Sequence, residues 1–148
     1  MKDEDFMREA IGEAVKAKEA GDLPFGAVVV KDGEIVAKGR AENNTIGDVT
    51  CHAELLAIRE ACRTLGTNDL SGCIFYCTNQ PCNMCAAGIF QANVPKVFMG
   101  VTREDLSWFL RPRNIGIDDL AKDSSYEVII EKGLLKDEIL PLFEYLKK

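Results

Sequence analysis

Strand-sized apolar runs alternate with helix-length segments through the middle of the chain, and this alternation limits the possible fold more than any other feature. Residues 73–77 and 97–100 are apolar runs with the length of short strands. Between them, Gln80-Pro81 begins a helical stretch that continues to about Gln91, with the proline well placed for a helix start. A strand, a helix and a strand in succession place the two strands parallel in one sheet. We therefore predict an α/β protein.

The segments on either side extend this sheet. Residues 25–30 and 34–39 have strand character, and the turn at Asp32-Gly33 predicts an antiparallel hairpin. Helical spacing of apolar residues predicts helices at residues 3–18, from near Thr50 to Leu65, and at 136–147. We expect residues 102–125 to be irregular and a last strand near residues 127–130. The expected fold is a three-layer α/β/α arrangement, with a mixed sheet between helices.

Composition narrows the class of protein. A length of 148 residues with 47% hydrophobic residues fits a single domain, which we expect to span residues 1–148. The net charge of −6 has the wrong sign for a domain that neutralises many phosphates. We find neither the pattern of a secretory leader nor a membrane-spanning apolar run, and we expect a cytoplasmic protein with reduced cysteines. Cys62, Cys73 and Cys77 lie in apolar patterns and are expected in the core.

Two predicted helix starts carry the residues most suited to chemistry. Residues 50–54 read Thr-Cys-His-Ala-Glu, and residues 81–85 read Pro-Cys-Asn-Met-Cys. Cys82 and Cys85 lie three residues apart on one face of a helical turn, where the helix dipole favours thiolates. His52 is the only histidine in the chain. Two thiolates and one imidazole are a typical zinc ligand set, so we predict one Zn²⁺ per chain held by these three residues.

Glu54 gives this predicted zinc site a possible catalytic group. A catalytic zinc keeps three protein ligands and a water, and a nearby carboxylate can carry the proton of that water. Glu54 reaches the site only if the helix begins near His52, because residues two apart on a regular helix point in different directions. Two alternatives remain at this point: a redox Cys-x-x-Cys motif, and a structural zinc site completed by Cys51 or Cys77.

The combination of His-x-Glu with Pro-Cys-x-x-Cys is the signature of zinc deaminases, which attack C4 of cytosine or C6 of adenine. With residues 24–30, 48–54 and 57–62, the chain resembles the cytidine and deoxycytidylate deaminase superfamily, in the branch of guanine, cytosine and tRNA adenosine deaminases. The resemblance implies a five-stranded sheet and a homodimer or larger assembly. It also implies that His52, Cys82 and Cys85 bind zinc and that Glu54 shuttles protons.

At the expected substrate contacts, the chain departs from the family pattern. Relatives carry a base-binding asparagine where this chain has Ala41, and Asn43 is a candidate replacement. Phe25 is a candidate aromatic wall for the base, and Asp119 resembles an acidic residue that contacts purine in guanine deaminases. Gln80 stands where the family usually has glutamate. Residues 108–114, which include the only tryptophan, are expected to form a lid or a dimer contact.

The negative charge decides between the substrates. We expect a metabolic deaminase that uses water to remove the exocyclic amine of a free nucleobase, guanine first and cytosine second, with nucleic acid an unlikely partner. The alternative is a tRNA-specific adenosine deaminase. A zinc-stabilised binding module without catalysis is a third possibility.

Overall fold

The computed structural model describes residues 1–147. The elements follow in the order α1 (Asp3–Glu19), β1 (Gly26–Lys31), β2 (Glu34–Arg40), α2 (Asn43–Ile46), α3 (Ala53–Leu65), β3 (Cys73–Asn79), α4 (Asn83–Gln91), β4 (Lys96–Val101), α5 (Ile117–Asp123), β5 (Ile129–Lys132), α6 (Lys136–Ile139) and the 3₁₀ helix η1 (Leu140–Leu146). No helix in this described part of the chain is both long enough and apolar enough to cross a bilayer.

The strands form one mixed sheet in the order β2-β1-β3-β4-β5. β1 pairs antiparallel with β2 and with β3, whereas β3, β4 and β5 run parallel to one another. Asp32 and Gly33 both have positive φ, which is the conformation of the two-residue turn that best matches the twist of a hairpin. The predicted hairpin and the parallel crossover are confirmed.

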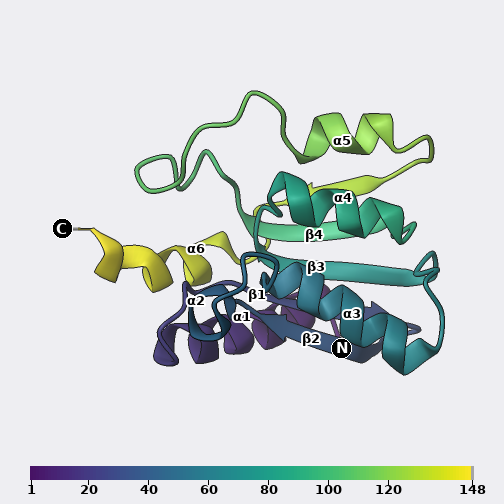
Figure 1. Ribbon diagram of the computed structural model, residues 1–148, viewed down its shortest axis with the longest axis horizontal. Helices are drawn as coiled ribbons and strands as arrows, with labels where there is room; N and C mark the ends of the chain where they lie inside the picture. The colour runs from purple at the N-terminus through teal and green to yellow at the C-terminus, as the bar shows by residue number, and fades with distance from the viewer. Residues whose placement is uncertain (148) are drawn as a thin grey trace.

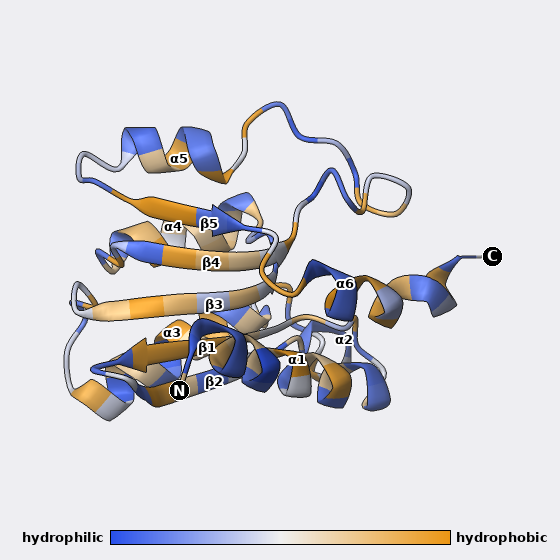
Figure 2. Ribbon diagram, turned by 180° about the vertical axis from the view of Figure 1, so that it is seen from behind, coloured by the Kyte–Doolittle hydropathy of each residue, from blue (hydrophilic) through white to orange (hydrophobic). Residues whose placement is uncertain are grey.

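Helices cover both faces of this sheet. Figures 1 and 2 show α3 and α4 on one face and α1 on the other. One core cluster lies under α3, α4 and α5, and a second lies under α1, α6 and η1. The chain therefore has the predicted three-layer α/β/α fold with a five-stranded mixed sheet.

Small residues bring α3 very close to the sheet. Ala53, Ala57 and Ala61 are fully buried and follow one another at four-residue spacing, so they form one face of the helix. Gly39 of β2 lies beneath this face, and a Cβ there would overlap the carbonyl oxygen of Ala53. This close packing fixes where α3 begins.

Several predicted boundaries differ from the structure. α3 begins at Ala53 rather than near Thr50, because Thr50 instead donates its amide and its hydroxyl to the carboxylate of Asp48. The stretch expected to be irregular contains α5, and the last strand lies at Ile129–Lys132 rather than at residues 127–130. The closing helix divides into α6 and a 3₁₀ turn, where Pro141 has no amide hydrogen to continue an α-helix.

Candidate metal centre

The start of α3 positions His52 and Glu54. His52 is the N-cap of α3, with extended backbone angles of φ −81° and ψ 152°, and Ala53 is the first helical residue. The helix thus begins directly after His52, which is the condition under which Glu54 can lie near the same site. Glu54 is 2% exposed.

The start of α4 positions the two cysteines in the same way. Cys82 is the N-cap of α4, with φ −66° and ψ 171°, and Cys85 lies in the first turn. α4 follows β3 after a short connection, so both sulfur atoms lie at the edge of the sheet where β3 ends. Open α/β sheets commonly build their sites at this edge.

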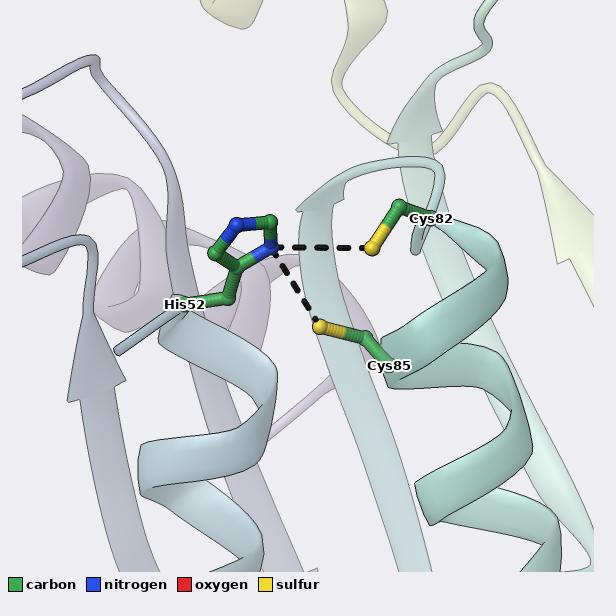
Figure 3. Close-up of side chains that lie close together, drawn as sticks. All are labelled: His52, Cys82 and Cys85. Carbon is green, nitrogen blue, oxygen red and sulfur yellow. Dashed lines mark hydrogen bonds between the residues drawn. The ribbon is translucent and has the colours of Figure 1, made fainter. Parts of the chain in front are cut away.

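The three side chains converge from the two helices, as Figure 3 shows. Nδ1 of His52 lies 3.6 Å from Sγ of Cys82 and 3.6 Å from Sγ of Cys85. Zinc bonds of about 2.3 Å to sulfur and about 2.0 Å to nitrogen place tetrahedral ligand atoms roughly 3.5 Å apart. The observed spacing and the donor types therefore fit a zinc ion, and these residues form a candidate zinc site.

The cluster has three ligands in the part of the chain that the structure describes. Neither Cys51 nor Cys77 belongs to the group of ligand atoms, although both are buried. Cys77 lies instead in the core cluster under α3 and α4, together with Cys73, and Cys62 packs against it. Three ligands with a fourth position free are typical of catalytic rather than structural zinc sites.

The electrostatics of the cluster favour a bound cation. A hydrogen bond from Cys85 and one from His52 lower the pKa of Cys82 to about 4, although burial opposes the shift. The hydrogen bond with Cys82 raises the pKa of His52, against the effect of burial. Burial and then the charge of Cys82 raise the pKa of Glu54 to about 7. The lowered pKa of Cys82 favours the thiolate, which is the form of cysteine that binds zinc.

A cavity of about 600 Å³ lies beside Cys82. The segment between β4 and α5, residues 102–116, forms much of its wall and leaves the sheet at the same edge as the two helix starts (Figure 1). Leu110, Arg111 and Pro112 of the predicted lid line the cavity, while the Trp108 side chain is 44% exposed.

None of the three predicted substrate contacts lines this cavity. Phe25 is half-buried, and its ring centroid lies 5.6 Å from that of Phe143. Asn43 begins α2, and its amide nitrogen lies 3.5 Å from the side-chain oxygen of Asn44. Asp119 accepts a hydrogen bond from the amide of Gly116 at 3.0 Å and so caps α5. Substrate contact by these residues stays a prediction.

The two departures from the family pattern have different structural consequences. Ala41 is buried, its amide donates to the carbonyl of Phe25, and its methyl side chain has no polar group for a base. Gln80 accepts a hydrogen bond from the amide of Arg103 at 2.9 Å. Asn83 donates to the carbonyl of Ile115 at 3.0 Å, a contact that sequence spacing could not have indicated. Gln80 and Asn83 thus hold the two ends of the 102–116 segment beside Cys82.

The fold and this candidate metal centre are typical of zinc-dependent deaminases. Residues 1–101 match the model of the cytidine and deoxycytidylate deaminase zinc-binding region, and the chain belongs to that family. The match covers both helix starts that carry the candidate ligands.

The names of individual relatives specify a substrate, which the family description does not. The chain is 47% identical over 98 residues to the tRNA-specific adenosine deaminase of Bacillus subtilis, a match that covers 66% of this chain and 61% of that protein's length. It is 42% identical over 106 residues to a guanine deaminase of Bacillus subtilis, which covers 71% of this chain and 68% of that one. A solved structure from a study of A-to-I editing by tRNA:A34 deaminases is similar with a TM-score of 0.77 and 32% identity, covering 93% of this chain and 98% of that chain.

These relatives contradict the expected substrate. We expected a free-nucleobase deaminase, guanine first, with nucleic acid an unlikely partner. This expectation is wrong, because the relative with 47% identity and the solved structure are both named for tRNA deamination. The expectation rested on a net charge of −6 averaged over the whole chain. A whole-chain average does not describe the local potential at a site, and three arginines line the cavity beside Cys82.

Proposed function

We propose that this protein is a zinc-dependent adenosine deaminase that acts on tRNA and converts adenosine to inosine with release of ammonia. The observation that carries the proposal is the three-ligand centre of His52, Cys82 and Cys85 with Glu54 buried beside it, in a chain similar over 93% of its length to a tRNA:A34 deaminase structure. The proposal takes residues 1–148 as one deaminase domain.

The residues divide the chemistry between them. His52 would bind zinc through Nδ1, and Cys82 and Cys85 would bind it through their sulfur atoms. Bound zinc supplies Lewis-acid activation of a water molecule at neutral pH. The Glu54 carboxylate accepts a proton from the attacking water and returns it to the leaving amino group. A C6–O bond forms, the C6–N bond breaks, and the products are inosine and ammonia.

The substrate class also fits the accessibility of the site. Enzymes that act on a base must take it out of the stack, which costs least where the nucleotide already lies in a single-stranded loop. The candidate site lies at the edge of the sheet and is bordered by a cavity, so an unstacked nucleoside can approach Cys82 from one side.

The decisive experiment compares an RNA with free bases. Zinc-loaded protein is incubated with an anticodon stem-loop RNA that carries adenosine at the wobble position, and inosine is measured by nuclease digestion and mass spectrometry. Ammonia release from guanine, cytosine, adenine and adenosine is measured in parallel. We expect inosine formation to be the fastest reaction; faster ammonia release from any free base would refute the proposal.

Glu54→Gln is the matched variant for the mechanism. It keeps the shape of the side chain but removes the proton acceptor, so we expect a loss of roughly 10²–10⁴-fold in kcat with zinc content unchanged. Unchanged activity in this variant would mean that Glu54 does not carry the proton.

The homodimer and the cytoplasmic location stay predictions. Light scattering measures whether the protein is a dimer in solution.

A further inference from the structure

Three arginines gather at the cavity beside Cys82. Arg103, Arg111 and Arg113 all lie on the segment between β4 and α5 and line the same cavity of about 600 Å³. Arg103 is partly buried, and its Nε donates to the carbonyl oxygen of Arg111 at 2.7 Å. The remaining guanidinium nitrogens of Arg103 and the exposed side chains of the other two arginines are free to meet a ligand.

The acidic residues of the cavity do not neutralise these arginines. Lys132 and Asp118 also line it, but they pair with each other at 2.7 Å. Glu104 is the other carboxylate on the wall. Among residues 1–147, none of the three arginines takes part in an ion pair. The cavity therefore carries a local positive charge in a chain whose net charge is −6.

The arginines are also close enough to repel one another. Burial lowers the pKa of Arg103, and the charges of Arg113 and Arg111 lower it further. A bound anion would relieve this repulsion. Guanidinium groups bind phosphate oxygens in a bidentate manner, which makes phosphate the anion best suited to such a group of arginines.

The position of this segment relative to the metal centre is fixed by hydrogen bonds. Gln80 binds the amide of Arg103 at one end, and Asn83 binds the carbonyl of Ile115 at the other. These two residues flank Pro81 and Cys82 in the chain. An anion held by the arginines would therefore lie in the cavity that Cys82 also lines.

We propose that Arg103, Arg111 and Arg113 bind the phosphodiester groups of the RNA strand next to the nucleoside at the metal centre. This inference rests on the proposed function, because it assigns the residues that hold the polynucleotide on either side of its target. Phosphate contacts position a strand without reading its sequence, so the cavity contributes affinity and placement rather than recognition of particular bases.

The test measures RNA binding rather than turnover. Zinc-loaded wild-type protein is titrated with the fluorescent stem-loop at several salt concentrations between 50 and 200 mM, alongside R111A/R113A. This double variant keeps the backbone carbonyl that orients Arg103. Zinc content and the thermal unfolding midpoint report that the variant is folded. The matched control is R59A/R63A, which removes two exposed arginines from α3, away from the cavity.

We expect R111A/R113A to weaken binding about tenfold or more near 100 mM salt. We also expect it to reduce the slope of log K against log salt by roughly one for each arginine removed. R59A/R63A should leave the slope and the affinity close to wild type. An unchanged slope in R111A/R113A, or an equal fall in both double variants, would overturn the assignment.

Further measurements separate the possible failures. If R111A/R113A slows deamination of adenosine 5′-monophosphate while its RNA salt slope stays wild-type, the arginines bind a terminal phosphate and the assignment to the RNA strand is wrong. If wild-type protein binds RNA with the expected arginine dependence but forms no inosine, the proposed function fails, whereas the binding of RNA phosphates by the arginines is supported. If wild-type protein does not bind the stem-loop at 50 mM salt, the inference fails.

Discussion

The close contact between β2 and α3 makes Gly39→Ala a sharp test of how the metal centre is built. The added Cβ would overlap the carbonyl oxygen of Ala53 and lie 2.8 Å from the amide nitrogen of Ala57. Ordinary contacts between nonbonded atoms are about 3.5–4.0 Å, so the start of α3 must move by on the order of 1 Å. His52 immediately precedes Ala53 and moves with it.

Two consequences can be measured. Overpacking of this kind costs about 1–3 kcal/mol in the free energy of unfolding. Metal sites tolerate shifts of only about 0.2 Å in ligand distance, and a misplacement of about 1 Å can lower a rate roughly 100-fold. We therefore expect Gly39→Ala to retain less zinc after dialysis and to lose about 100-fold in kcat/KM, as measured by metal analysis and inosine formation.

Gly12→Ala is the control, because nothing lies within 4 Å of the position of its added Cβ on α1. It should stabilise the protein by about 0.5–1 kcal/mol in urea unfolding, since alanine favours helix more than glycine, and leave activity unchanged. If Gly39→Ala binds zinc and turns over like wild type, the packing of α3 on β2 does not set the position of His52 and the reasoning is wrong.

Three further outcomes follow from the site and the core. Dialysis against a zinc chelator should abolish deamination and added Zn²⁺ should restore it, whereas activity that persists in metal-free protein would contradict a catalytic zinc. Partial burial alone would raise the pKa of Asp105, but hydrogen bonds from Lys136 and Thr102 lower it overall. A carboxyl whose pKa is lowered by folding gives stability that is complete above its unfolded pKa of about 4 and is lost as pH falls through its folded pKa. In urea unfolding, Asp105→Asn should therefore be less stable than wild type at pH 7 but not in strong acid. A difference in stability that does not change with pH would argue against this. Phe143→Ala removes a fully buried ring and should cost about 3–5 kcal/mol in urea unfolding, and a loss below about 1 kcal/mol would show that the second core cluster tolerates the cavity.

The metal centre could be predicted from the sequence because its determinants are local. Cys82 and Cys85 lie within one turn, and His52 is the only histidine in the chain. The sequence predicted that Glu54 lies at the site only if α3 begins near His52. That start depends on a local hydrogen bond between Thr50 and Asp48, and on the packing of Gly39 against Ala53, which is a tertiary contact.

The basic cavity could not be predicted in the same way, because long-range contacts hold the segment with its three arginines beside Cys82. The hydrogen bond from Arg103 to Gln80 joins residues 23 apart, and that from Asn83 to Ile115 joins residues 32 apart. Neither contact follows from a repeat or a spacing rule. A net charge summed over the chain therefore concealed a basic cavity. The order of the sheet, with β1 between β2 and β3, was likewise not specified by the hairpin pattern alone.

The ligand set also has a consequence for folding. His52 and Cys82 are 30 residues apart, and they begin helices that follow different parts of the sheet. An ion bound by both would join these two helix starts only in the folded protein, so its binding free energy would add to the free energy of unfolding. The ion proposed for catalysis would then also act as a reversible cross-link between the hairpin half of the protein and its parallel half.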